Sequence, residues 1–328
     1  MFHRRVNRPA RRHRTARGDG VHVTLEALIA LRNEAHGVIP AAHRPVGSVL
    51  AGQHLSRFRG RGMDYQESRI YQAGDDIRNM DWRVTARAGR PHVKLYQEER
   101  ERPVVVLVDF SPTLFFATRG VFKSVVAARA AAFLAWAAVG NGDRIGALLV
   151  NGGHRELQPT GGDQGALRLI RALVEVADPD KGLSREMQPD GFNEALRRLR
   201  RVARPGSLIF ILSDFYGLDE ASVMLLGQLR RHSEVAACQI LDVLERVPPP
   251  PGQYPVTDGK QRGILDTRDR EARRAYEEVL AAHQGELETA LRAQAIPLVS
   301  LDTAADTVTE LRRFLQVRGR RRRRGRAA

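Results

Sequence analysis

Five oxygen-bearing side chains could converge on one divalent cation. Asp109, Ser111 and Thr113 form the pattern D-x-S-x-T directly after an apolar run, and Asp214 ends a second apolar run. Thr160, in the turn-like sequence Pro-Thr-Gly-Gly, adds a hydroxyl from a third segment. Mg²⁺ takes oxygen ligands and keeps several waters. Because few carboxylates would neutralise the ion, it would accept an acidic side chain from a partner. The other interpretation is that Asp109 caps a helix in a fold without metal.

The elements that would position these residues alternate between buried strands and amphipathic helices. The sequence predicts strands at 104–109, 144–150, 207–214, 235–241 and 296–301, and helices at about 121–139, 163–176, 190–203, 219–231, 269–294 and 305–317. This alternation predicts an α/β fold with a doubly wound, mainly parallel sheet of the Rossmann type. Ligands of such sheets bind beyond the carboxyl ends of the strands, at a topological switch point.

A smaller N-terminal segment precedes the sheet, with a helix expected at 24–36 and a strand at 92–96. Between them lies a polar signature of nine residues that we expect to be structural: Arg69, Tyr71, Gly74, Asp75, Asp76, Arg78, Asp81, Trp82 and Arg87. Asp75 or Asp76 can cap a following helix, and Gly89 can end it. The arginines, with Arg83, can form a bidentate lattice with the carboxylates, and a ligand-binding role is the alternative.

The 328 residues carry a formal charge of +15, concentrated at the two ends. Residues 1–17 and 318–328 each hold seven arginines and no acid, so subtracting them leaves +1 for residues 18–317. We expect a basic disordered arm (1–23), a signature region (24–103), an α/β domain (104–317) and an Arg-rich disordered tail (318–328). Polyanion or nucleic-acid binding through the tails is an alternative function, which the lack of interleaved aromatics disfavours.

A single cysteine, Cys238, excludes an internal disulfide and a cysteine-based zinc site. The sequence shows no signal peptide, and its longest apolar stretch is interrupted by charges. We therefore expect a cytoplasmic protein without a membrane span. A phosphatase-like enzyme of the haloacid dehalogenase type is a minor alternative. Such an enzyme needs D-x-D-x-T, and here Ser111 stands at the second acidic position, where it cannot serve as the general acid. We expect no enzymatic activity.

The Asp109, Ser111, Thr113, Thr160 and Asp214 set resembles the metal-ion-dependent adhesion site (MIDAS) of von Willebrand factor A domains, with Thr113 in place of the usual second serine. Together with the R-x-Y-x-x-G-D-D-x-R-x-x-D-W signature, it makes residues 24–317 similar to the bacterial domain of unknown function 58 (DUF58) family. The segment from Asp242 to Glu245 also resembles that family, with Val243 replacing a proline.

The resemblance implies a von Willebrand factor A-like domain and a partnership with a MoxR-type AAA+ ATPase in assembling or activating a client protein. The expected function is therefore that of a non-catalytic, metal-dependent, protein-binding adaptor.

Overall fold

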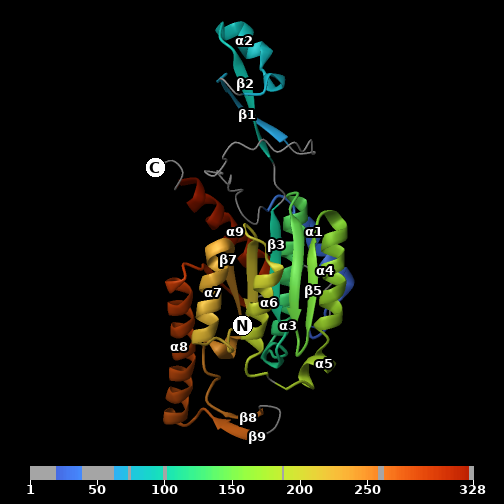
Figure 1. Cartoon of the computed structure of the whole chain (residues 1–328). Helices are drawn as coiled ribbons and strands as arrows, with labels where there is room; N and C mark the ends of the chain where they lie inside the picture. Colours follow the sequence, from blue (N-terminus) through green and yellow to red (C-terminus); the bar gives the residue numbers. More distant parts are fainter. Residues whose placement is uncertain are drawn as a thin grey trace, which may run out of the picture. The chain divides into compact units, whose positions relative to one another are not determined.

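A computed structural model describes residues 20–38, 63–72, 75–98, 102–186, 188–257 and 262–324 (Figure 1). The chain divides into two compact units, one formed by residues 1–42 with 102–328 and the other by residues 43–101. Residues 1–19 and 325–328 of the basic arms, and Gly74 of the signature, lie outside the described residues.

A six-stranded sheet forms the centre of the larger unit, in the order β10-β7-β6-β3-β4-β5. Its strands are β3 (Pro103–Asp109), β4 (Arg144–Val150), β5 (His154–Thr160), β6 (Leu208–Ser213), β7 (Glu234–Leu241) and β10 (Leu298–Asp302). All neighbouring pairs are parallel except β4 with β5. The predicted mainly parallel α/β sheet is thus confirmed.

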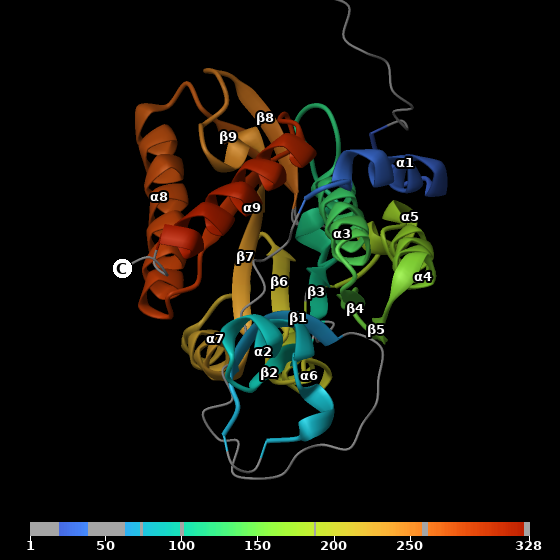
Figure 2. The same cartoon turned by 90° about the horizontal axis from the view of Figure 1, so that it is seen from above.

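Helices cover both faces of this sheet. They are α1 (Leu25–Ala35), α3 (Lys123–Gly140), α4 (Gly162–Val176), α5 (Pro179–Leu183), α6 (Gly191–Val202), α7 (Glu220–His232), α8 (Arg270–Ala293) and α9 (Thr307–Arg324). Residues of α1, α3, α4 and α9 share one apolar core, and residues of α6, α7 and α8 share another. Figure 2 shows α1, α3 and α9 on one side of the strands and α6 and α7 on the other. The sheet is therefore doubly wound, as predicted.

The central strand β3 explains why its sequence is a continuous apolar run. Val104, Val106 and Val108 pack in the first core, while Val105 and Leu107 pack in the second. All five side chains are fully buried. Successive side chains of a strand point to opposite faces, so a strand covered on both sides has no polar face.

Helix α1 corrects the predicted domain boundary. Leu28, Leu31 and Ala35 are buried in the first core, and the Trp136 Nε1 of α3 donates to the Leu28 carbonyl at 3.1 Å. The helix thus belongs to the α/β unit, although the sequence analysis grouped it with the signature. Its short apolar face could not reveal which partner it covers.

The C-terminal boundary also differs from the expectation. Residues 318–324 continue α9 instead of starting a disordered tail. Arginine is a good helix former, so a helix already packed through Val308, Leu311 and Leu315 can extend into an Arg-rich segment.

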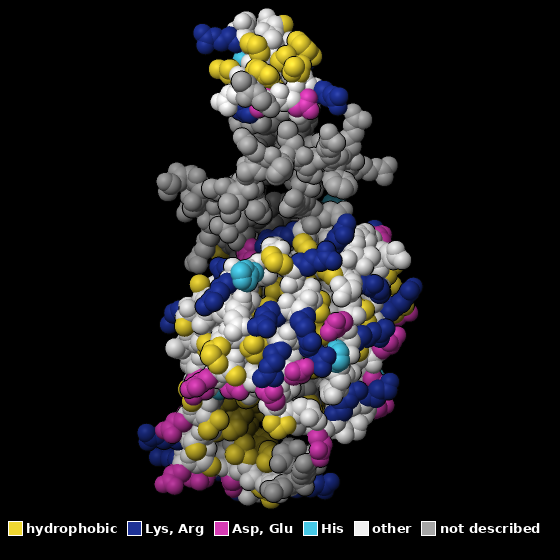
Figure 3. All heavy atoms as spheres, viewed as in Figure 1, with side chains coloured by type: hydrophobic (Ala, Val, Ile, Leu, Met, Phe, Trp, Pro, Cys, Tyr) yellow, Lys and Arg dark blue, Asp and Glu magenta, His cyan; other side chains and the backbone are white. Residues whose placement is uncertain are grey.

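A hairpin and two short 3₁₀ helices lie among the loops of the larger unit. The hairpin consists of β8 (Gln253–Thr257) and β9 (Arg262–Asp266), and the 3₁₀ helices are η2 (Pro112–Leu114) and η3 (Val243–Glu245). On the face seen in Figure 3, basic and acidic side chains are interspersed, in keeping with the near-neutral charge of residues 18–317.

Among the described residues, only α3 is long and apolar enough to cross a membrane, and 83% of that window is buried inside the protein.

The smaller unit contains an antiparallel pair, β1 (Met63–Ile70) and β2 (His92–Glu98), with η1 (Ile77–Asn79) and α2 (Trp82–Ala88) between them.

Candidate metal-binding site at the carboxyl edge of the sheet

The predicted D-x-S-x-T loop folds into a compact cluster of oxygens after β3. The Asp109 carboxylate accepts from the Ser111 backbone N–H at 3.1 Å and from the Ser213 hydroxyl at 2.8 Å. The hydroxyls of Ser111 and Thr113 lie 3.0 Å apart. Pro112 starts η2 directly after Ser111, which turns the loop back so that both hydroxyls stay close. Three of the five predicted ligands are therefore brought together.

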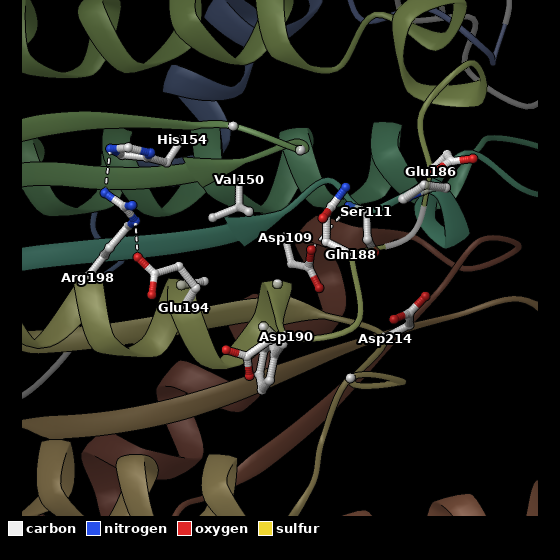
Figure 4. Close-up of a pocket in the computed structure, with 17 residues that line it drawn as sticks. Asp109, Ser111, Val150, His154, Glu186, Gln188, Asp190, Glu194, Arg198 and Asp214 are labelled. Carbon is white, nitrogen blue, oxygen red and sulfur yellow. Dashed lines mark hydrogen bonds and ion pairs between the residues drawn. The ribbon is translucent and has the colours of Figure 1, made fainter.

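Asp214 lies across the switch point from this loop. Strands β3 and β6 are parallel neighbours, and the chain winds outward from them in opposite directions, so both strands end at one crevice. Asp109 and Asp214 line a single cavity of about 370 Å³ (Figure 4). The two carboxylates thus lie at the same edge of the sheet, as expected, and their role as metal ligands stays a prediction.

The backbone after β6 is constrained next to Asp214. Phe215 has φ of 62°, a left-handed conformation that is rare for a bulky residue. Its ring is fully buried against Phe192, with ring centroids 5.8 Å apart, and its N–H donates to the Ser213 hydroxyl at 2.9 Å. This packing holds the turn that places Asp214 at the cavity.

Two effects raise the pKa of Asp109 to about 6. Burial disfavours its charged form, and the negative charge of Asp214 adds to this effect. The hydrogen bonds from Ser213 and Ser111 oppose the shift only in part. An aspartate whose charge is this poorly compensated is a favourable place for a cation, which would remove the repulsion.

Lys123 is a functional candidate that the sequence analysis missed. It is the first residue of α3 and only 1% exposed, and its Nζ lies 2.9 Å from Asp214 Oδ2 and 2.7 Å from Glu245 Oε1. Burial disfavours its charge, but the two carboxylates outweigh that effect and raise its pKa. A helix N-terminus is unfavourable for a cation, so the two carboxylates are what keep it there. The one available signal was a lysine beginning an otherwise apolar, Ala-rich helix.

Glu245 joins this cluster from the loop after β7. Its second carboxylate oxygen accepts from the Asp242 backbone N–H at 2.7 Å, and Asp242 in turn caps η3. The Tyr216 ring lies 5.6 Å from Lys123 Nζ and stacks on His283 of α8, with ring centroids 4.4 Å apart. Lys123 therefore ties together loops from three different strands.

Thr160 is not part of the site, which corrects the prediction. It is the last residue of β5 and pairs with Ile145 at the start of β4, whereas Asp109 pairs with Val150 at the end of β4. Five residues of strand, on the order of 16 Å, separate the two positions. The assignment failed because β5 is antiparallel, so its carboxyl end returns to the opposite edge of the sheet. The Thr160 hydroxyl donates to the Gln158 carbonyl instead.

The far side of the cavity is polar and internally paired. Arg198 of α6 lies 2.8 Å from Glu194 and 2.8 Å from the His154 ring (Figure 4). Asp190 pairs with Arg197 at 2.7 Å. These ion pairs leave the Asp109 end of the cavity as the region of uncompensated negative charge.

The chemistry of these donors fits a hard divalent cation. Asp109 supplies a carboxylate, Ser111 and Thr113 supply hydroxyls, and Asp214 supplies a second carboxylate at the cavity, with one oxygen held by Lys123. Hard cations prefer such oxygen donors. Within the described part of the chain, no three His, Cys, Asp or Glu side chains are grouped for metal binding, so a zinc-type ligand set is not formed there.

The signature residues form local caps more than a lattice. Asp81 caps α2 through the Val84 N–H at 3.1 Å and accepts from Ser68 Oγ at 2.7 Å. Asp76 caps η1, and Gly89 ends α2 in the left-handed conformation, as predicted. Tyr71 contributes its backbone N–H to the Pro91 carbonyl.

The predicted arginine lattice is reduced to one bidentate pair. Arg69 holds Asp75 through contacts of 2.9 and 2.6 Å. Arg78, Arg83 and Arg87 form no carboxylate pair within the described residues, because their side chains face solvent. Trp82 is 66% exposed, so the tryptophan of the signature does not contribute to a core here.

Comparison with known proteins assigns the chain to a family. The model of the family described as protein of unknown function DUF58 matches residues 67–286. The chain belongs to the DUF58 family. Its relatives include uncharacterized proteins of Mycobacterium tuberculosis and Mycobacterium bovis, each 33% identical over 274 residues, which cover 83% of this DUF58 chain and 84% of theirs.

Solved structures similar to this DUF58 protein include the conserved hypothetical protein BatB from Bacteroides thetaiotaomicron, with a TM-score of 0.41, 15% identity and coverage of 66% of this chain and 98% of that one. An aerotolerance-related membrane protein from Bacteroides fragilis gives a TM-score of 0.39, 14% identity and coverage of 66% and 98%. A von Willebrand factor type A protein from Catenulispora acidiphila gives a TM-score of 0.34 and 11% identity, with coverage of 69% of this chain and 43% of that one.

Proposed function

We propose that this protein is a non-catalytic adaptor whose von Willebrand factor A-like unit binds a partner through a divalent cation, Mg²⁺ or a similar ion. The observation that supports the proposal is that Asp109, Ser111 and Asp214 line one cavity at the switch point. The Thr113 hydroxyl lies 3.0 Å from that of Ser111. When bound, the ion would supply a Lewis-acidic centre for a carboxylate of the partner. Asp109, Ser111 and Thr113 would hold it.

The partner class follows from charge. An ion held by few carboxylates and neutral hydroxyls keeps unsatisfied positive charge, which an Asp or Glu side chain of the partner can neutralise. The cavity volume of about 370 Å³ accommodates such a side chain together with coordinated water. We further propose that a MoxR-type AAA+ ATPase acts with this adaptor on a cytoplasmic client protein, on the basis of the family resemblance.

Direct metal titration tests the proposal. Chelator-treated protein is titrated with Mn²⁺, and free Mn²⁺ is followed by electron paramagnetic resonance. We expect saturable binding at one site, weakened by Thr113→Val and lost in Asp109→Asn. Thr160→Val is the matched control, because it removes the same hydroxyl at the opposite edge of the sheet and should leave binding unchanged. Unchanged binding in Asp109→Asn protein would rule out this site.

A further inference from the structure

Lys123 places a permanent positive charge beside the candidate cation site. Its ammonium group is within 3 Å of the carboxylates of Asp214 and Glu245, and the side chain is buried. Asp214 lines the cavity together with Asp109. Of the two carboxylates that Lys123 contacts, Asp214 is therefore the one that borders the cavity. A bound divalent cation and this ammonium would therefore compete for the charge of Asp214.

The charges of these four side chains balance in a specific way. When all are ionised, Asp109, Asp214 and Glu245 contribute three negative charges and Lys123 one positive charge. The net of two negative charges is what one divalent cation neutralises. The loaded site would then be neutral, and a partner's carboxylate would approach it without net repulsion. Without the lysine, the loaded site would keep one negative charge and would repel that carboxylate.

We propose that Lys123 is a resident counter-cation that weakens divalent-cation binding at Asp109 and keeps the loaded site able to accept a partner's carboxylate. Its ion pair engages one oxygen of Asp214, which leaves Asp109 as the principal carboxylate for the metal. This inference rests on the proposed function and identifies the residue that couples the metal to the partner.

Two substitutions of opposite sign test the coupling. Lys123→Met removes the ammonium and should tighten Mn²⁺ binding at least about tenfold, because a nearby positive charge is lost. Glu245→Gln leaves the lysine with one carboxylate and should weaken Mn²⁺ binding by a similar factor. Millimolar acetate, used as the carboxylate probe, should increase Mn²⁺ affinity most in Glu245→Gln, less in the wild type and least in Lys123→Met.

The controls separate the possible outcomes. Near-ultraviolet circular dichroism checks folding. If Lys123→Met does not fold, Lys123→Met/Glu245→Gln is compared with Glu245→Gln, and it should bind Mn²⁺ more tightly because this comparison also removes only the ammonium. Wild-type binding that does not tighten in Lys123→Met would overturn the lysine's role and leave the metal site standing. Binding in Lys123→Met alone would support Lys123 as the counter-cation and remove the metal from the wild-type function. Failure of every variant to bind would overturn both proposals.

Discussion

Asp109 ends β3 and Asp214 directly follows β6, its parallel neighbour, and both carboxylates border the same cavity, yet among the described residues only Asp214 has a cation beside it. Asp214 is paired with the buried Lys123, whereas Asp109 is held by hydroxyl and amide donors. This difference means that the two acids respond differently to pH, to mutation and to added metal.

The Asp109 carboxyl makes stability depend on pH. Its pKa of about 6 in the folded protein lies above the ordinary value of 3.8, so the folded state binds a proton that the unfolded state has already lost. Without metal, this group's contribution falls as pH rises from about 4 to 6. Between pH 5 and 7.5 the wild type should lose about 1.4 kcal/mol more unfolding free energy than Asp109→Asn. Urea denaturation of both proteins at the two pH values would measure it, and equal losses would contradict the expectation.

Loss of the Ser213 hydroxyl should shift the titration of Asp109 further. The hydroxyl donates to the carboxylate at 2.8 Å and favours its charged form. In Ser213→Ala we therefore expect a pKa above that of the wild type, measured by ¹³C NMR of the labelled aspartate carboxyl. Ser300→Ala is a control with the same substitution at a strand that does not border the cavity. A lower pKa in Ser213→Ala would show that this hydrogen bond does not favour the carboxylate.

Replacing Lys123 should lower the unfolding free energy because it leaves two carboxylates inside the protein without a cation. In Lys123→Ala, Asp214 and Glu245 lose their shared cation inside the protein. Removing one partner of a buried ion pair costs about 3–5 kcal/mol. Lys181, whose side chain is 63% exposed, pairs with Asp178 at the surface, and Lys181→Ala should change the unfolding free energy by less than about 0.5 kcal/mol. Thermal unfolding compares the two, and similar losses would contradict the burial argument.

Gly182 tests how tightly helix α5 packs against Phe115. A Cβ at this position would lie only 2.2 Å from the buried ring of Phe115, which follows η2. Gly182→Ala should therefore destabilise by about 1–3 kcal/mol. Gly285→Ala, in the middle of α8, meets nothing within 4 Å and should stabilise by about 0.5–1 kcal/mol. Denaturant unfolding reports both, and a neutral Gly182→Ala would mean that the ring moves freely.

The parts of the fold that could be predicted are those with an unambiguous hydrophobic pattern. Strands β3 and β6 are buried on both faces, so their apolar runs identified them, and Asp109 and Asp214 followed as strand-end residues. The single pattern D-x-S-x-T also indicated the loop that borders the cavity together with Asp214. Local sequence identifies such strands because a continuous apolar run reflects burial on both faces.

The parts that could not be predicted depend on the direction of a strand in the sheet and on contacts between residues far apart in the sequence. Strand β5 lies at the edge of the sheet and buries only Leu157, and nothing in its residues says that it runs antiparallel, so Thr160 was placed at the wrong edge. Lys123 and Glu245 lie 122 positions apart, and their pairing emerges only when α3 and η3 meet. A lysine is also usually a surface residue, so its type argued against burial.

The order of the two units along the chain has a practical consequence. The smaller unit, residues 43–101, interrupts the larger one between α1 and β3 in the sequence, and its strands β1 and β2 pair with Met63 opposite Glu98. It is therefore anchored covalently on both sides, so that one protease cut in either connection would open the polypeptide without releasing this unit.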